Sequence, residues 1–326
     1  MNHYYIGIDG GGTKTEAVLI DRTGMVLARR IGGASNPNDV TPSASCDVME
    51  SLVHGLLVDA NLSEGENAVY LFGGIAGALN HRNTLVHEMK FRLPNLAGID
   101  VGSDVINLLS GVLPTGDGAC IICGTGSACF LRRDRELIRI GGWGYLLDSA
   151  GSGYDIGRQA LEAVLRAHDR RDPATVLTEL LAEKLGGEVH TKLSEIYEKG
   201  KPYIAACAPA VFEAAAKRDA TAQAILMRNA GALAEYIEAA WLWLCEGRDV
   251  PPTSLPVVMG GGISQHEAPM WSDLVASMVD GSVPATVQTT ETPMVWGAIV
   301  EAIKLDPTCS DADFDSLRDQ YLATRP

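Results

Sequence analysis

The sequence predicts an α/β protein built from two related halves. Residues 4–33 and residues 119–142 each read as three short apolar strands joined by tight turns, and helical patterns follow both stretches. Both stretches place a glycine turn after their first strand and end in Ile-Gly-Gly, which indicates an internal repeat. The 326 residues suffice for two domains at roughly 150 residues each. The alternative is a chance likeness between two β-meanders, which are common.

The elements of the first half follow in order. After the meander, we expect a helix from Pro42 to Ala60, a strand over 68–72, a helix near 84–93 and a strand over 98–101. Ser103 is expected to cap a further helix that runs to about Val112.

The second half is richer in helix. After its meander, helices are expected from Tyr154 to His168 and, with Pro173 in the first turn of the next one, almost continuously to Cys245. The strand 255–259 leads into Gly260-Gly261-Gly262. Ser264-Gln265-His266-Glu267 matches a capping box, so one helix is expected from there to about Asp280. Thr292-Pro293 opens a last helix to Lys304.

The charge balance argues against nucleic acid and membrane partners. Lys and Arg number 26 and Asp and Glu 41, which gives a formal charge of −15 and a pI near 4.8. The apolar stretch 230–245 is interrupted by Glu235 and Glu238 and is too short to span a bilayer, so it is expected to be a buried helix. The seven cysteines do not form paired metal-binding spacings. Without a secretory leader pattern, a reduced cytoplasmic location is expected.

Two glycine turns have the composition of phosphate-binding sites. Glycine leaves backbone N–H groups free of side-chain obstruction, so the turn containing Gly11, Gly12, Thr13 and Lys14 predicts an anion cradle. The turn of Gly124, Thr125, Gly126 and Ser127 predicts a second one. Asp9 ends the first strand beside the first turn, where its carboxylate would hold a hydrated Mg²⁺.

Other nucleotide signatures are missing, since neither a P-loop nor a Rossmann glycine motif occurs. Tight turns use glycine for conformational reasons alone, and this is the competing interpretation of each turn. Two such turns in repeated contexts, with the third at 260–262 before a helix, favour nucleotide binding.

The order of four motifs resembles a known superfamily. IGIDGGGTKTEAVLID, ICGTGSA, GGWGYLL and VVMGGGIS follow one another as in the actin-like ATPase and sugar-kinase superfamily. In detail the chain is similar to the N-acetylglucosamine kinase branch, which is grouped with the BadF/BadG-type ATPases. The motifs cover residues 4 to about 304.

The resemblance implies two duplicated ribonuclease-H-like domains with an ATP cleft between them. It implies an N-terminal domain over 1–113, a C-terminal domain over 114–291, and a helix over 292–305 that packs back on the first domain. The acidic tail 306–326 is expected to be weakly packed. The two glycine turns match the phosphate motifs, with Mg²⁺ at Asp9, and Gly260, Gly261 and Gly262 match the adenosine motif.

The resemblance also implies catalytic and substrate residues. Asp104, at the start of a helix, matches the catalytic aspartate, whereas the residues alone equally allow a helix-capping role. Asn36 matches a substrate asparagine, although Asn-Pro is also an ordinary turn signal. Trp143 and Gly144 lie in a glycine-rich loop where a pyranose could be contacted, although Trp143 could instead be a core residue.

One stretch departs from the family pattern. The family reads Gly-Asp-Glu-Gly-Ser where this chain has Asp148-Ser149-Ala150-Gly151-Ser152, so Ser149 stands in for a sugar-binding aspartate and Asp148 lies one position early. Ala128 replaces a family asparagine. Lost hydrogen-bonding groups change specificity sharply. The expected substrate is therefore an amino sugar that could be N-acetylglucosamine, N-acetylmuramic acid or glucosamine.

Two other functions share this fold. One is an ATPase that activates an acyl-CoA dehydratase or reductase through an iron–sulfur cluster, with Cys120, Cys123 and Cys129 as the nearest thiols, but alternate strand positions would point Cys120 and Cys123 apart. The other is a sugar-kinase-like regulator, which would need a DNA-binding segment and a more basic surface. The family often forms dimers, so a homodimer is expected, with 210–245 contributing.

Overall fold

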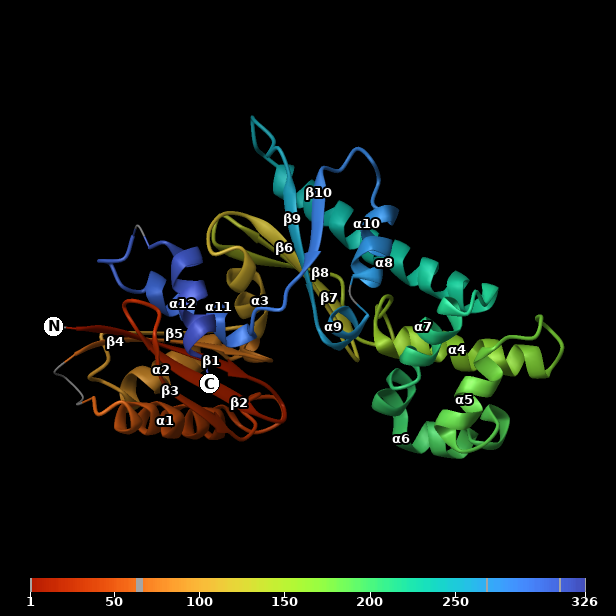
Figure 1. Cartoon of the computed structure of the whole chain (residues 1–326), viewed down its shortest axis with the longest axis horizontal. Coiled ribbons are helices and arrows are strands. Elements are labelled where there is room, and N and C mark those ends of the chain that lie inside the picture. The colour runs from red at the N-terminus through yellow and green to blue at the C-terminus, as the bar shows by residue number, and fades with distance from the viewer. Residues whose placement is uncertain (1, 63–66, 268, 311, 326) are drawn as a thin grey trace. The chain divides into compact units, whose positions relative to one another are not determined.

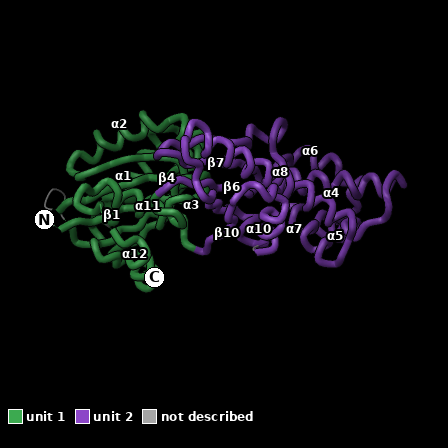
Figure 2. Tube along the Cα trace, turned by 90° about the horizontal axis from the view of Figure 1, so that it is seen from above, with its two compact units in different colours: residues 1–115, 292–326 green, residues 116–291 purple. Residues whose placement is uncertain are grey.

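The computed structural model describes residues 2–62, 67–267, 269–310 and 312–325 and contains two five-stranded mixed sheets surrounded by helices (Figure 1). The predicted α/β class is confirmed. The chain divides into two compact units, of which unit 1 comprises residues 1–115 and 292–326 and unit 2 comprises residues 116–291 (Figure 2).

Unit 1 is formed by the first half of the chain and its C-terminal segment. Its strands are β1 (His3–Gly10), β2 (Thr15–Asp21), β3 (Val26–Gly32), β4 (Ala68–Ile75) and β5 (Gly98–Gly102). Its helices are α1 (Pro42–Asp59), η1 (Ala78–Asn80), α2 (Arg82–Arg92), α3 (Asp104–Val112), α11 (Met294–Lys304) and α12 (Phe314–Thr324).

The sheet of unit 1 has the order β3-β2-β1-β4-β5. The first three strands are antiparallel, and β4 and β5 run parallel to β1. Successive side chains of a strand face opposite sides, so Ile6 and Ile8 pack in the core under α1 and α2, whereas Tyr5 packs with α11. The carboxyl ends of β1, β4 and β5 therefore meet at one edge.

The C-terminal tail is folded onto unit 1, so the expectation of weak packing was wrong. Beyond Asp306 the chain forms α12, and Tyr321 is fully buried with its ring stacked on Trp296 of α11 at 5.2 Å between centroids. The Thr324 hydroxyl also accepts a hydrogen bond from the Val26 N–H at 3.1 Å. The tail is thus anchored by the buried Tyr321 ring and by the buried Asp306 carboxylate, while Asp313, Asp315 and Asp319 are exposed.

Unit 2 repeats this design with additional helices. Its strands are β6 (Gly118–Cys123), β7 (Ser127–Arg133), β8 (Glu136–Ile140), β9 (Leu255–Gly260) and β10 (Ala285–Thr289). Its helices are α4 (Gly153–His168), α5 (Leu177–Leu185), η2 (Val189–Thr191), α6 (Leu193–Ala205), α7 (Ala208–Ala216), α8 (Ala220–Cys245), α9 (Gly262–His266) and α10 (Met270–Met278).

The sheet of unit 2 has the order β8-β7-β6-β9-β10, which matches unit 1 strand for strand. Again the first three strands are antiparallel, and β9 and β10 run parallel to β6. Ile121, Cys123 and Leu131 pack in the core under α4, α7 and α8. The predicted repeat is thus confirmed at the level of sheet topology.

Two local expectations in unit 2 were wrong. Pro173 lies outside a helix, because α5 begins only at Leu177, after Thr175 accepts a hydrogen bond from the Leu177 N–H. The capping-box residue Ser264 lies within α9, which starts at Gly262, and its hydroxyl is buried. The single helix expected up to Asp280 is instead two helices, α9 and α10.

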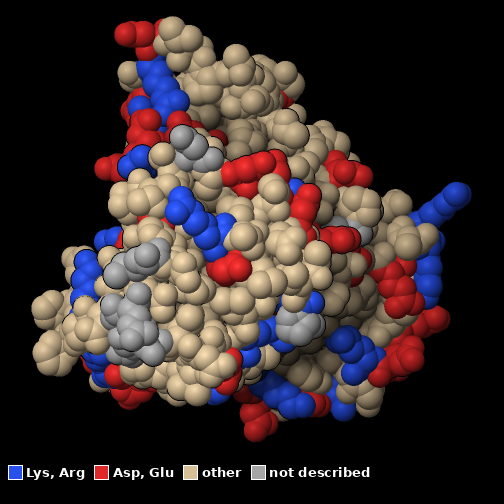
Figure 3. Space-filling view, turned by 60° about the vertical axis from the view of Figure 1, so that its left-hand side comes forward, with Lys and Arg blue, Asp and Glu red and all other residues tan. Residues whose placement is uncertain are grey.

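On the face shown in Figure 3, basic side chains are interspersed with acidic ones rather than gathered into one basic field. No helix among the described residues combines the length and apolarity that a membrane crossing requires.

The anchoring of the tail can be tested with Tyr321→Ala. Loss of this buried ring should lower the free energy of unfolding by about 3 kcal/mol, because large aromatic side chains removed from a core cost this much. Leu322→Ala, at the exposed neighbouring position, is the matched control. Urea denaturation of both variants provides the measurement, and equal stability of the two would show that the Tyr321 ring does not anchor α12 to unit 1.

Candidate functional site

The first glycine turn is a closed hairpin between β1 and β2. The Gly11 N–H donates to the Lys14 carbonyl at 3.0 Å, so this donor is used within the turn. Thr13 and Lys14 are exposed. Asp39, which the sequence reasoning missed, lies against the turn, because a Cβ on Gly12 would come within 2.7 Å of its carboxylate. The Asn36 N–H donates to the Gly11 carbonyl at 3.2 Å and so keeps the 35–39 loop beside the hairpin.

Asp9 is held by a buried amide. The Asn107 Nδ2 group, on α3, donates to Asp9 Oδ1 at 2.9 Å and to the Gly74 carbonyl at 3.2 Å. Asn107 is fully buried, and its amide packs directly on Gly74, where a Cβ would clash. Asn107 was missed by the sequence reasoning, although its i,i+3 spacing from Asp104 places both on one helix face and could have indicated it.

The environment of Asp9 makes its carboxylate unusually basic. Burial raises the pKa of Asp9 from 3.8 to about 6, the Asn107 hydrogen bond opposes this, and the neighbouring charge of Asp104 adds to it. Asp9 and Asp104 therefore lie close enough to repel each other. A divalent cation would relieve this repulsion, and Asp9 offers the hard oxygen that Mg²⁺ prefers.

Asp104 lies in the first turn of α3, where β5 ends. The N-cap of this helix is Ser103, whose hydroxyl accepts from the Val105 N–H at 3.4 Å, so the capping role belongs to Ser103. The Asp104 carboxylate accepts from the Ser103 hydroxyl and from the Val105 N–H, each at 3.0 Å. Burial nevertheless raises the pKa of Asp104. A partly buried carboxylate with raised basicity suits proton abstraction.

Asn36 is half-buried and engaged locally. Its Nδ2 donates to Asp39 Oδ2 at 2.7 Å, and its Oδ1 accepts from the Asn38 N–H at 3.0 Å. Both Asn36 and Asn38 lie over Gly77, in the loop after β4. Its role in binding a substrate stays a prediction, and a bound sugar would have to share or replace these contacts.

The second glycine turn, between β6 and β7, rests on the start of a helix. Its Gly124 carbonyl accepts from the Gly153 N–H at 2.8 Å, and the Gly124 N–H donates to the Gly126 carbonyl at 2.9 Å. The Ser127 hydroxyl donates to the Ala150 carbonyl at 2.7 Å and is buried. Ser127 therefore stabilises the loop before α4, and Thr125 is the exposed residue of the turn, whereas Gly124 and Gly126 are half-buried.

The third glycine run packs against the second turn. Gly261 has a φ of +90°, and a Cβ there would lie 2.5 Å from the Cys123 carbonyl, so only glycine fits between β9 and α9. A Cβ on Gly124 would in turn come within 4.0 Å of the Gly262 N–H. The structure thus brings Gly124 and Gly260–Gly262 together at one edge of the sheet.

An apolar cavity of about 290 Å³ adjoins these glycines. Its lining includes Gly124, Thr125, Pro202, Ala205, Phe212 and Ile263. A mostly apolar cavity of this size beside exposed backbone can accept a flat heterocycle with a polar extension. The helical residues of this lining were missed by the sequence reasoning, because helix packing decides which faces of α6 and α7 border the cavity.

The loop after β8 carries the remaining predicted residues. Trp143 is 62% exposed, which excludes the core interpretation, and the Arg139 guanidinium lies 4.7 Å from its ring centroid. Asp148 accepts a hydrogen bond from the Tyr236 hydroxyl at 2.6 Å and bridges to Gly144. Ser149 donates to the Tyr145 carbonyl at 3.3 Å. The loop lies beside the second turn, since Gly142 packs on Ser127 and Ala128.

Lys201 is a further residue at the second turn that the sequence reasoning missed. A Cβ on Gly126 would lie 3.5 Å from its Nζ. Lys201 stands between Gly200 and Pro202, two helix-breaking residues inside a helical stretch, and this irregularity was the available signal.

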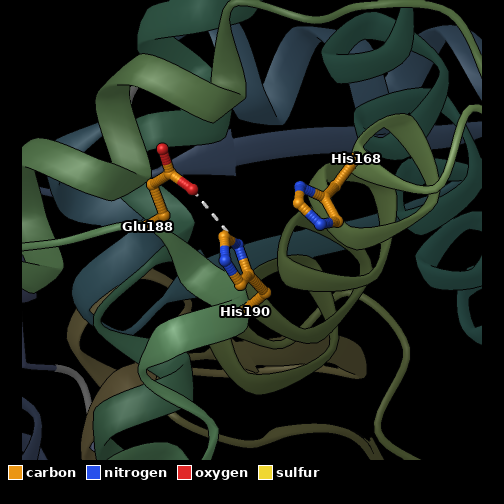
Figure 4. A group of neighbouring side chains, drawn as sticks. All are labelled: His168, Glu188 and His190. Atoms are coloured by element: carbon orange, nitrogen blue, oxygen red, sulfur yellow. Dashed lines mark ion pairs between the residues drawn. The ribbon is translucent and has the colours of Figure 1, made fainter.

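Among the described residues, one group of side chains has the composition of a transition-metal site. His168, Glu188 and His190 are exposed, with ligand atoms within 4.8 Å of one another, and the His190 ring lies between the other two side chains (Figure 4). The two imidazoles stack at 4.2 Å between centroids. His168 ends α4 whereas Gly153 begins it, so the group lies roughly 22 Å along the helix from the second turn. It belongs to neither glycine turn.

Comparisons with known proteins agree on one family. The family model of the BadF/BadG/BcrA/BcrD ATPases matches residues 6–302. An N-acetylmuramic acid/N-acetylglucosamine kinase of Clostridium acetobutylicum is 31% identical over 72% of this chain and 78% of its own. An N-acetyl-D-glucosamine kinase of Dictyostelium discoideum is 30% identical over 91% and 97%. The structure of a candidate N-acetylglucosamine kinase of Chromobacterium violaceum superposes with a TM-score of 0.65 at 25% identity over 91% and 98%.

The burial of Asp9 predicts a pH-dependent stability. Because the pKa of Asp9 is raised in the folded protein, the folded state binds more protons than the unfolded state between about pH 4 and pH 6, and stability falls as the pH rises through this window. Asp9→Asn should therefore stabilise the protein at pH 7, and the gain should vanish below pH 4. Thermal unfolding across this range measures the difference. A gain in stability of Asp9→Asn that does not vary with pH would contradict the raised pKa of Asp9.

Proposed function

The chain belongs to the BadF/BadG/BcrA/BcrD ATPase family, and on this basis we propose that it is an ATP-dependent kinase that phosphorylates a hydroxyl group of an amino sugar. The observation that carries the proposal is the match to two relatives named as amino-sugar kinases, which extends over 72% and 91% of the chain. A third relative is named glucosamine kinase GspK.

The nucleotide would be held mainly by unit 2. The apolar cavity bounded by Gly124, Phe212 and Ile263 suits an adenine ring, and the N–H groups at Thr125 and Gly126 suit phosphate oxygens. In unit 1, Thr13 and Lys14 are exposed and could contact phosphate as well.

Asp9 would hold a hydrated Mg²⁺. It belongs to no group of three converging metal ligands among the described residues, which fits an ion that keeps most of its waters. When bound, Mg²⁺ would neutralise charge on the transferring phosphoryl group. Asn107 contributes by fixing Asp9 Oδ1, so that one orientation of the carboxylate is preferred.

Asp104 is the proposed general base. The sugar hydroxyl oxygen forms a bond to the terminal phosphorus of ATP, the bond from that phosphorus to the bridging oxygen breaks, and the hydroxyl proton passes to Asp104. The two hydrogen bonds from Ser103 and Val105 go to Oδ1, so they fix the carboxylate in one orientation. Phosphoryl transfer depends chiefly on such positioning, because the nucleophile is a weak alcohol.

In unit 1 the proposed sugar contact is Asn36, and in unit 2 the proposed sugar contacts lie in the 143–149 loop. Ser149 and Ala150 provide fewer hydrogen-bonding groups than the family's Asp-Glu pair, and the Ser149 hydroxyl is already bonded to the Tyr145 carbonyl. Asp148 is fixed by Tyr236 and would be the remaining acidic contact. We propose N-acetylglucosamine, N-acetylmuramic acid or glucosamine as the substrate. A cytoplasmic homodimer remains a prediction.

The dehydratase-activating ATPase is not favoured. Cys120, Cys123 and Cys129 are all fully buried, and Cys123 and Cys129 are part of the hydrophobic core under the helices of unit 2. Burial also raises the pKa of the Cys123 thiol to about 12, which opposes the thiolate form that binds iron. An iron–sulfur cluster shared between two subunits needs thiolates at a surface.

A sugar panel tests the proposed activity. The protein is incubated with ATP, Mg²⁺ and one of N-acetylglucosamine, N-acetylmuramic acid, glucosamine, N-acetylmannosamine or glucose, and products are read by mass spectrometry. A phosphorylated product is expected from one or more of the first three. The absence of product from every sugar would reject the proposal.

Asp104→Asn tests the general base. This substitution keeps the size of the side chain but removes its basicity, so turnover should fall by roughly 10²–10⁴ while ATP affinity is retained. Asp100→Asn, on the preceding strand and paired with Arg82, is the control and should retain activity. Near-normal turnover of Asp104→Asn would assign the base elsewhere.

A further inference from the structure

Lys201 stands at a break in α6 that the backbone imposes. Gly200 adopts φ +61° and ψ −146°, a conformation outside the helical region and disfavoured for other residues. Pro202 follows and disfavours a helical conformation at Lys201. The helix therefore resumes in a new direction after Lys201, and this side chain leaves the helix at its bend.

The bend places the Lys201 ammonium beside the second glycine turn. Its Nζ lies 3.5 Å from the position that a Cβ of Gly126 would occupy. The Tyr145 ring lies 5.5 Å from the same Nζ, and it packs edge-on against Tyr154 in the first turn of α4. Lys201 is thus half-buried between the turn and an aromatic face, a setting in which a lysine is partly desolvated.

Lys201 has no carboxylate partner among the described residues, unlike its neighbour. Lys199, two residues earlier, forms an ion pair with Glu195 at 2.6 Å. In a chain of formal charge −15, a half-buried ammonium that lies beside a glycine turn and has no acidic partner among the described residues is suited to an anion. The glycine at 126 leaves the space in front of this ammonium open.

The ammonium also continues a path from the apolar cavity. Pro202, the next residue, lines the cavity, as do Gly124 and Thr125 of the turn. Gly126 follows Thr125 in the turn and lies beside the Lys201 ammonium. A ligand with an apolar ring in the cavity and an anionic chain along the turn would therefore meet Lys201 at the far end of the turn.

We infer that Lys201 binds the phosphate chain of the nucleotide and that the Gly200 break positions it for this contact. The inference rests on the proposed function, since it takes ATP as the ligand of this cavity. The Lys201 ammonium donates hydrogen bonds to phosphate oxygens. Adenosine has no phosphate group and cannot accept them. Lys201 therefore gives selectivity for ATP and ADP over adenosine.

The test compares Lys201→Met with Lys199→Met in the full-length protein. Binding of ATP, ADP and adenosine is measured by calorimetry in the presence of Mg²⁺. Because a hydrogen bond to a charged group contributes strongly to binding, Lys201→Met should weaken the binding of ATP and of ADP by about 10- to 100-fold. Adenosine binding should change less than about threefold, and Lys199→Met should bind all three ligands as the wild type does. Lys201→Arg, which keeps the charge, should recover part of the ATP affinity.

Gly200→Ala provides a second variant that leaves the ammonium in place. Alanine is strained at this φ, so the bend should relax and ATP binding should weaken while adenosine binding is retained. Circular dichroism and thermal unfolding confirm that each variant is folded.

The outcomes separate this inference from the proposed function. If wild-type protein binds ATP and phosphorylates a sugar but Lys201→Met binds ATP as Lys199→Met does, the inference is wrong and the function stands. An equal loss of adenosine and ATP binding would also overturn it, because Lys201 would then only support the cavity. If the wild type binds no nucleotide, the proposed function itself fails.

Discussion

The side-chain amide of Asn107 is the contact on which the arrangement of unit 1 depends. This one buried group joins α3 to the ends of β1 and β4, because its Nδ2 donates both to the Asp9 carboxylate and to the Gly74 carbonyl. Gly74 leaves room for this amide, and Gly297 of α11 packs on the backbone of Asn107. Removal would leave buried acceptors unpaired and free Asp9 to rotate. The packing of three elements and the orientation of the Asp9 carboxylate thus have the same cause.

The two units share one sheet topology, but different side chains surround their glycine turns. In unit 1, Asp9 and Asp39 lie beside the glycine turn and the charge of Asp104 acts on Asp9, and burial raises the pKa of Asp9 and Asp104. In unit 2 the equivalent turn faces an apolar cavity and the Lys201 ammonium. The proposed metal binding and proton abstraction therefore rest on side chains of unit 1, and the proposed nucleotide binding rests on the cavity of unit 2. Duplication supplied the backbone turn twice, and the side chains around each copy distinguish their roles.

The sequence predicted the repeat, the glycine turns and the strands other than β10, because these depend on local patterns of apolar residues and glycine. It missed β10 (Ala285–Thr289), an edge strand whose residues are half-buried or exposed. It failed for the tail, where Tyr321 finds a partner in Trp296 that no local pattern reveals. It also failed at Ser264, where a capping motif is overridden by close packing of Gly261 on Cys123. Asn107 and Lys201 escaped notice because their importance comes from residues far along the chain, Asp9 and Gly126. Contacts between residues far apart in the sequence therefore determine features that local periodicity does not reveal.

The fate of the terminal phosphoryl group tests the central claim most directly. ATP labelled at its γ-phosphate is supplied with and without the sugar that the panel identifies, and the label is followed into sugar phosphate and inorganic phosphate. A kinase with a positioned hydroxyl acceptor should transfer nearly all of the label to the sugar and release little phosphate when the sugar is absent. Release of labelled inorganic phosphate at the same rate with or without sugar would contradict the kinase and indicate an ATPase.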